Sequence, residues 1–252
     1  MSTYIKFVIH AKTKSLYLYC FISCLLGYIT SVYGDDISFF HPHEADYKVS
    51  VRGITGELKT SVKLTDADGF LISNQLKTTG LIGAFLKGVV TETAEFKIYN
   101  TYIRPNKYYS LDTLSSKEKE LQLDFNWQDN ILYVRENQLS SSFPLSQNVY
   151  DRITLKYAIM NDLKNDRNTK IYRLHEGDKI KEIEAKILPE KTIEVPTGTY
   201  NVIGIQNQAS GSSKMSILWC AIDLDYLPVR IQQYRNDKLW MNAELIHYRN
   251  TT

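Results

Sequence analysis

The chain has 252 residues, enough for one large domain or two modest ones. It carries 30 Lys and Arg against 28 Asp and Glu, a formal net charge of +2, which argues against a strongly basic nucleic-acid-binding protein. Aromatic residues make up 12% of the chain and include 18 Tyr. Because such residues suit half-buried, pleated surfaces, the composition favours β structure.

The N-terminus has the pattern of a secretory signal peptide. Three Lys residues precede an apolar run over residues 16–30, and small residues follow up to Gly34. The run is shorter than the roughly 20 apolar residues that a membrane-spanning helix needs, and a basic flank with a short apolar core is typical of a signal peptide. We therefore expect residues 1–34 to be removed on export, which leaves no transmembrane segment. The alternative is an uncleaved N-terminal anchor.

Removal of this leader changes the charge and the cysteine content. Residues 1–34 contain three Lys and no acidic residue, which leaves 27 basic and 28 acidic residues and a net charge of −1. A nucleic-acid partner is therefore not expected. Cys20 and Cys24 also lie in the leader, so Cys220 has no cysteine left with which to form an intramolecular disulfide. It lies in the apolar run ILWCAI, which predicts a buried and unreactive thiol.

After the leader, apolar residues alternate with polar ones in many places, as in strands with one buried face. The alternation covers 47–51, 70–76 and 94–98, where Asn74 has the same parity as its apolar neighbours. It is clearest over 121–127, which a short polar loop joins to the apolar run 131–134. These last two segments predict a β-hairpin.

One segment has a helical pattern. Apolar residues recur at spacings of three and four from Val149 to Leu163, which indicates an amphipathic helix over 146–165. Ser146, Asn148 and Asp151 are alternative N-caps. The helix separates two β-rich parts, and no Pro- or Gly-rich linker flanks it.

The second β-rich part contains a sharp corner and a second hairpin. Val195-Pro196-Thr197-Gly198-Thr199 joins two β-favouring runs, and its Pro and Gly are residues that tight turns prefer. We expect this corner to build the sheet rather than to take part in chemistry. A further hairpin is expected to join 228–235 to 239–248 through Asn236-Asp237-Lys238.

These elements predict a mainly β protein. We expect a strongly curved antiparallel sheet, or an open β-barrel, wrapped around one principal α-helix. Residues 35–252 would form a single β-rich domain, with β-rich parts over 39–145 and 169–249 and the helix over 146–165. The sequence leaves open whether side chains fill the interior or a cavity remains.

Two long segments resemble a known family. VPTGTYNVIGIQ and ILWCAIDLDYLPVRIQQY are similar to the second half of the bacterial exported family called domain of unknown function 3108, and the resemblance extends over 39–245. It implies an antiparallel β fold and an envelope or periplasmic location, but no reaction. The motif positions to which it gives a structural role are Pro196, Gly198, Asp225, Tyr226, Pro228 and Arg230.

Candidate sites for chemistry are few. His41-Pro42-His43-Glu44 is the cluster most like a metal site, but zinc needs at least three protein ligands, so we expect a solvated segment and no metal or other cofactor. Asp223 and Asp225 could serve acid–base chemistry on one face of a strand, although a turn or surface role is preferred. A G-x-S-x-G elbow is absent from the sequence. We expect a role without catalysis.

The stretch TTGLIGAFL, with apolar residues between glycines, is the best candidate for binding. It would form either a lip over a cavity or a short buried turn that plugs the end of the sheet. The ligand-binding candidates are Leu81, Phe85, Tyr157, Tyr200 and Trp219. The favoured interpretation is binding of an apolar or envelope-derived ligand between sheet and helix. An envelope assembly or protein-interaction module without a cavity is the alternative, and a hydrolase of envelope material is a third.

Overall fold

The computed structural model describes residues 40–80, 88–176 and 179–252. The predicted leader therefore lies outside the described residues, as do Leu81 and Phe85. None of the described helices is long and apolar enough to cross a lipid bilayer.

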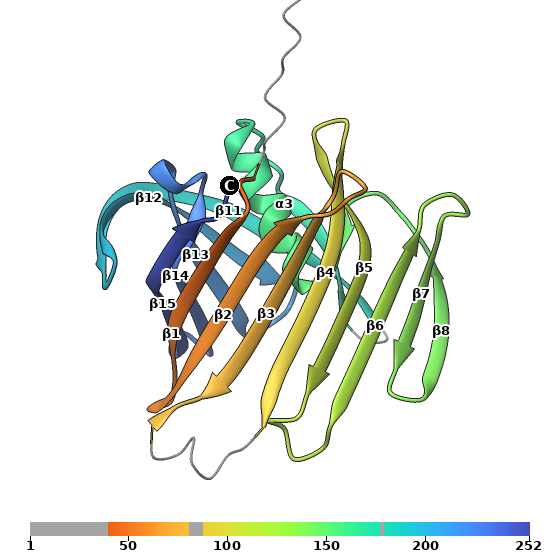
Figure 1. The fold of residues 1–252 in the computed structure, drawn as a ribbon, viewed down its shortest axis with the longest axis horizontal. Coiled ribbons are helices and arrows are strands. Elements are labelled where there is room, and N and C mark those ends of the chain that lie inside the picture. The colour runs from red at the N-terminus through yellow and green to blue at the C-terminus, as the bar shows by residue number, and fades with distance from the viewer. Residues whose placement is uncertain (1–39, 81–87, 177–178) are drawn as a thin grey trace, which may run out of the picture. The chain divides into compact units, whose positions relative to one another are not determined.

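The described residues form one sheet of fifteen strands and one α-helix, so the mainly β prediction is confirmed (Figure 1). The sheet order is β8-β7-β6-β5-β4-β3-β2-β1-β15-β14-β13-β12-β11-β10-β9, antiparallel except between β9 and β10. The strands are β1 (His43–Val51), β2 (Ile54–Leu64), β3 (Phe70–Thr78), β4 (Val89–Tyr99), β5 (Tyr102–Asp112), β6 (Lys119–Asn126), β7 (Ile131–Glu136), β8 (Leu139–Pro144), β9 (Val149–Tyr150), β10 (Ile171–Glu176), β11 (Lys179–Val195), β12 (Gly198–Ala209), β13 (Lys214–Ala221), β14 (Leu227–Arg235) and β15 (Lys238–Asn250).

Both predicted hairpins are present, as β6–β7 and β14–β15. The alternation in β1 also separates a buried face from a more exposed one, as predicted, because its first, third, fifth and seventh residues are buried. His43 is the first of these and is only 4% exposed. The expectation that His41–Glu44 is a solvated segment is therefore wrong for His43, because the strand begins there and turns this ring inward.

The first and last strands pair with each other, and this pairing joins the two halves of the sheet. β1 runs antiparallel to β15, with His43 opposite Asn250 and Val51 opposite Met241. From this seam, β1–β8 and β9–β15 curl towards each other (Figure 1). At the far ends, Phe143 of β8 and His175 of β10 make an edge-to-face ring contact at 5.2 Å. Among the described strands no pairing joins β8 to β9 or β10, so the curled sheet stays open.

The helix α3 (Arg152–Lys164) lies between these two halves and contacts β4, β5, β9 and β10. It is shorter than predicted, because Val149 and Tyr150 form strand β9 and pair with β10. Asp151 is the N-cap, one of the three predicted alternatives.

The helix is also buried on nearly all sides rather than on one stripe. Polar residues on the buried sides have partners within the fold. Asn161 donates a hydrogen bond of 2.8 Å to the carbonyl of Thr101, and Asp162 accepts hydrogen bonds of 2.9 Å from Tyr172 and Arg167. Enclosure by the sheet therefore hides side chains that a helical wheel would place towards solvent.

Aromatic rings pack the space between α3 and the β1–β4 region. Tyr157 is fully buried, and its ring centroid lies 5.4 Å from Phe40 and 5.6 Å from Phe96. Phe70 stacks on Phe96 at 5.2 Å. Beside the helix lie two cavities of only about 10 Å³ each, roughly the space of one water molecule. Side chains thus leave little space at these two places beside the helix.

Candidate functional site

The register of the sheet aligns four polar side chains across its inner face. Thr60 of β2 lies opposite Asn74 of β3, Asn74 opposite Glu92 of β4, and Glu92 opposite Ser110 of β5. They face inward because the same face carries buried apolar residues two positions further along, such as Val62 next to Thr60. A polar row therefore borders the apolar core on the inner face.

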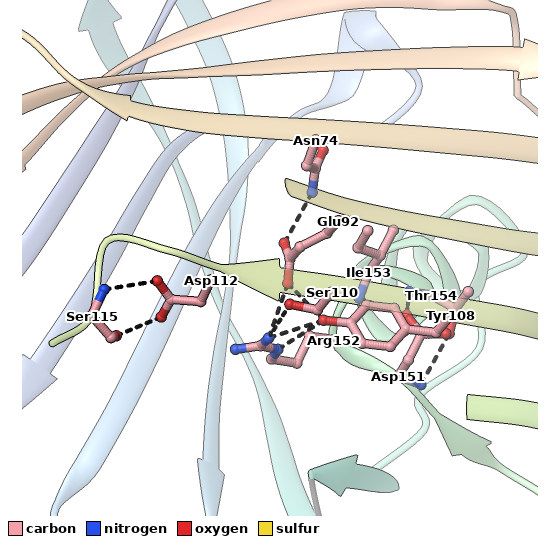
Figure 2. Close-up of polar contacts among 10 residues, drawn as sticks. All are labelled: Asn74, Glu92, Tyr108, Ser110, Asp112, Ser115, Asp151, Arg152, Ile153 and Thr154. Atoms are coloured by element: carbon pink, nitrogen blue, oxygen red, sulfur yellow. Dashed lines mark hydrogen bonds and ion pairs between the residues drawn. The ribbon is translucent and has the colours of Figure 1, made fainter. Parts of the chain in front are cut away.

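Hydrogen bonds link this row. Thr60 Oγ1 donates to Asn74 Oδ1 at 2.9 Å, and Asn74 Nδ2 lies 3.5 Å from Glu92 Oε2. Tyr108 of β5, one row nearer to α3, donates its hydroxyl proton to Glu92 Oε1 at 2.7 Å (Figure 2). Burial and the nearby Glu92 carboxylate raise the pKa of Tyr108, so the phenol stays protonated as this donor.

Arg152, the first residue of α3, completes the group. Its Nη2 lies 3.1 Å from Glu92 Oε1 and donates a hydrogen bond of 2.9 Å to the Tyr108 hydroxyl (Figure 2). The Arg152 side chain is 46% exposed and that of Glu92 is 18% exposed. We call Thr60, Asn74, Glu92, Tyr108, Ser110 and Arg152 the inner-face cluster; solvent reaches it through Arg152.

The N-cap of α3 fixes where Arg152 lies. The carboxylate of Asp151 accepts hydrogen bonds from the backbone of Ile153 at 2.8 Å and Thr154 at 2.9 Å, and from the Thr154 hydroxyl at 2.6 Å. Asp151 is fully buried, and this desolvation raises its pKa to about 6 despite the three hydrogen bonds. The cap starts the helix immediately before the arginine that joins the cluster.

Lys156 lies one helical turn after Arg152, on the same side of α3. Its side chain is half-buried, and its ammonium lies 5.0 Å from the centroid of the Tyr157 ring. Desolvation lowers the pKa of Lys156 to about 8, while the charge of Glu92 acts in the opposite direction. A second cation is thus held inside the curled sheet beside the cluster.

Apolar side chains continue on the inner face, on the side of the cluster away from the core. Leu58, Leu76 and Val90 lie opposite one another on β2, β3 and β4, and all three are half-buried. Met241 of β15 and Ile231 of β14 are half-buried on the other half of the sheet. The cluster therefore separates a filled apolar core from apolar surface that remains partly open.

Comparison with models of known protein families identifies the family of this chain. A model of a protein family of unknown function, DUF3108, matches residues 46–237. The chain belongs to the DUF3108 family. The resemblance seen in the sequence is confirmed.

Matches to solved structures were found for this DUF3108 chain, two of them at very low sequence identity. A β-barrel-like protein of domain of unknown function DUF1849 from Brucella abortus matches with a TM-score of 0.56 and 8% identity, over 82% of this chain and 97% of that one. A protein with a YmcC-like fold from Bacteroides fragilis matches with a TM-score of 0.32 and 10% identity, over 83% and 96%. The first likeness shows a shared β-barrel-like fold, and the second is too weak to show one. None of the curated proteins compared with the chain matches it.

Several DUF3108 motif residues gather where the β11–β12 hairpin meets the outer face of the sheet. The predicted corner is a two-residue turn at Pro196 and Thr197, followed by Gly198 with a φ of +140°. Arg230 of β14 donates a hydrogen bond of 2.6 Å to the carbonyl of Glu194, close to this turn. Arg230 therefore holds the end of this hairpin against β14.

Trp219 lies on the outer face of β13, opposite to the interior. Its neighbour Cys220 is fully buried and interacts electrostatically with Lys156 inside, so alternation directs Trp219 outward. The Trp219 ring lies under the ammonium of Lys191, 3.4 Å from its centroid, and its indole donates to Gln232 at 3.0 Å. Trp219 and the buried Tyr157 therefore lie on different faces and do not line one cavity.

The other predicted ligand residues are also dispersed. Tyr200 is half-buried opposite Ile193, next to the corner and away from the inner-face cluster. Leu81 and Phe85 lie outside the described residues. Ligand binding by these five residues stays a prediction.

Asp223 and Asp225 do not share one face of a strand but lie in a turn, which is the placement that the sequence analysis preferred. They belong to a 3₁₀ turn, η1 (Ile222–Leu224), and to the residue that follows it. Asp225 and Tyr226 both have positive φ, 51° and 60°, and Pro228 is the second residue of β14. Asp225 forms an ion pair with Lys164 at 2.9 Å, so this motif residue fastens the turn to the end of α3.

Sequence reasoning missed the inner-face cluster, although a signal was present. Asn74 and Glu92 share the parity of buried apolar neighbours in their strands, which is unusual for polar residues. Arg152 and Lys156, spaced by four, likewise place two cations on one side of the helix. Polar residues at inward positions were the sign that the interior is not uniformly apolar.

Proposed function

We propose that this DUF3108 protein is exported to the periplasm and binds an apolar or envelope-derived ligand on the inner face of the sheet, without catalysing a reaction. One observation carries the proposal. Leu58, Leu76 and Val90 face the interior yet remain half-buried, in a row beside the inner-face cluster. Inward apolar side chains in a filled barrel would be fully buried.

An apolar ligand that covers this row would bind favourably, because it would remove the exposed parts of these side chains from water. Apolar surface removed from water contributes about 25 cal/mol per Å², so covering three such side chains would contribute on the order of 1 kcal/mol each. Met241 and Ile231 on the opposite half offer similar surface. A ligand held between the halves would contact both.

Ligand binding can be tested with a fluorescent apolar probe, N-phenyl-1-naphthylamine, and with native mass spectrometry of protein purified from the cell envelope. Leu76→Glu places a charge on the inner face and should weaken probe binding about tenfold, since the charge must be desolvated. Gln75→Glu on the outward side of the same strand is the matched control and should leave binding unchanged. Absence of probe binding and of any co-purified small molecule would contradict the proposal.

Export rests on the leader pattern of residues 1–34 and is tested separately. Osmotic-shock fractionation should release the protein with the periplasmic contents, and N-terminal sequencing should find a chain that begins near Asp35. Protein that stays in the cytoplasm with residues 1–34 intact would contradict this part, whatever the outcome for the ligand.

An interaction module is the second candidate, and strand β8 favours it. β8 is an end strand of the sheet, Leu139 on it is 78% exposed, and Ser140–Ser142 are exposed as well. Exposed end strands can pair with another chain. Under this alternative, Leu139→Asp would abolish capture of a partner while Leu76→Glu would have no effect; ligand binding predicts the reverse.

A further inference from the structure

Two tyrosine hydroxyls inside the sheet have no hydrogen-bond partner. Tyr47 of β1 is 1% exposed and Tyr157 of α3 is 0% exposed, and the part of the chain that the structure describes offers neither Oη a partner. A buried hydroxyl without a hydrogen-bond partner destabilises the folded protein, because it has lost its contacts with water. Both hydroxyls could therefore be satisfied by a polar partner that the protein itself does not supply.

A cation without a counter-ion lies next to them. Within residues 40–80, 88–176 and 179–252, Lys156 forms no ion pair. Glu92, the carboxylate whose charge acts on it most strongly, is already bound by Arg152 and Tyr108. A half-buried ammonium in such surroundings is poorly solvated and poorly compensated.

The three groups lie around one region between the two halves. The Lys156 ammonium lies 5.0 Å from the centroid of the Tyr157 ring, and Tyr47 lies directly opposite Leu58 of the half-buried apolar row. Lys156 also interacts electrostatically with Glu92 of β4 and Cys220 of β13, and Tyr47 with Tyr157 and Cys220. Cys220 is thus a common neighbour of the lysine and of Tyr47. Solvent reaches the half-buried Lys156, and the open apolar row begins beside the cluster that adjoins it.

We propose that this region binds the anionic headgroup, a carboxylate or a phosphate, of an amphiphilic ligand; the inference rests on the function proposed above. Lys156 supplies the positive charge, and the hydroxyls of Tyr47 and Tyr157 donate hydrogen bonds to the anion. The apolar chain of the ligand lies along Leu58, Leu76 and Val90. The ligand thereby provides the partners that these polar groups lack.

Three probes that share a sixteen-carbon alkyl chain test this proposal: palmitate, hexadecyl phosphate and the neutral hexadecanol. Their binding to the exported full-length protein is followed by displacement of N-phenyl-1-naphthylamine. At least one anion should bind about tenfold more tightly than hexadecanol, the gain of one charge-assisted contact. Lys156→Met should remove that difference and leave hexadecanol binding unchanged. Lys48→Met, exposed on β1, should alter none of the affinities.

The tyrosines are tested by Tyr47→Phe and Tyr157→Phe, which keep the rings. Each should weaken anion binding several-fold without lowering the stability of the free protein, because the hydroxyl removed is unpaired. The tighter of the two anions identifies the headgroup as carboxylate or phosphate. Equal affinity for all three probes, unchanged in Lys156→Met, would overturn the headgroup site while the proposed function stands. Failure of all three to bind would overturn both.

Discussion

Arg230 fastens the end of the β11–β12 hairpin to the rest of the sheet, because its Nη2 donates to the backbone carbonyl of Glu194 at 2.6 Å. The same guanidinium lies 2.9 Å from Glu244 of β15. The hairpin end, β14 and β15 are thus joined by one side chain. Its planar array of donors makes both contacts at once, which a lysine ammonium cannot reproduce.

Arg230→Lys should therefore lower the free energy of unfolding by about 1–2 kcal/mol. Urea unfolding followed by circular dichroism measures the change. Arg135→Lys, exposed on β7, is the control and should stay within about 0.5 kcal/mol of the parent. Equal stability of both variants with the parent would show that Arg230 does not fasten the hairpin.

Gly204 permits the close approach of β12 to the Trp219 ring. A Cβ at this position would lie 2.6 Å from a carbon of that ring and 3.0 Å from Cβ of Leu188. Gly204→Ala should cost about 1–3 kcal/mol because the ring must move, with a change in tryptophan fluorescence. Adding Trp219→Leu should recover part of this cost in a double-mutant cycle. Strict additivity of the two substitutions would contradict the packing argument.

Asp151 should make stability depend on pH. Its folded-state pKa of about 6 lies above the unfolded value of about 3.9. The folded state therefore binds more protons between these values, and the contribution to stability is fully present below pH 3.9 and lost as the pH rises through 6. Asp151→Asn keeps an acceptor for the cap and removes this titration.

The measurement compares urea unfolding of the parent and of Asp151→Asn at several pH values from 4 to 7. The parent should gain up to about 2 kcal/mol relative to the variant as the pH falls across this range. A constant difference between the two proteins would mean that the carboxylate does not titrate there.

Cys220 should be unreactive in the folded protein. It is fully buried, and desolvation raises its pKa to about 12, so almost no thiolate exists at neutral pH. In a chain with Cys20→Ser and Cys24→Ser, Ellman's reagent at pH 8 should detect about one thiol in guanidinium and almost none in buffer. Rapid reaction of the native protein would show that the interior around β13 opens readily.

The local elements were largely predictable because they depend on neighbouring residues. Alternation placed the β6–β7 and β14–β15 hairpins, and the Pro196–Gly198 corner specified its own turn. The start of α3 was misplaced because Val149 continues a helical spacing, yet its backbone pairs with β10. Local periodicity does not show that competing tertiary pairing.

The inner-face cluster could not be predicted as a site. Thr60, Asn74, Glu92 and Ser110 become neighbours through the registers of three strand pairs, which a single sequence does not reveal. Arg152 joins them only because the sheet curls around α3. The sequence instead favoured aromatic residues as ligand contacts, but Trp219 packs on the outer face and the Tyr157 ring packs within the core.

The pairing of β1 with β15 gives the fold a high contact order, since His43 must find Asn250 before the two halves join. The ends of the described chain meet there, as Thr251 donates a backbone hydrogen bond of 2.9 Å to Pro42. A circular permutant that links residue 252 to residue 40 and opens between β8 and β9 would make every antiparallel pair sequential. It should fold faster than the natural order in stopped-flow refolding, by a route that adds one hairpin at a time.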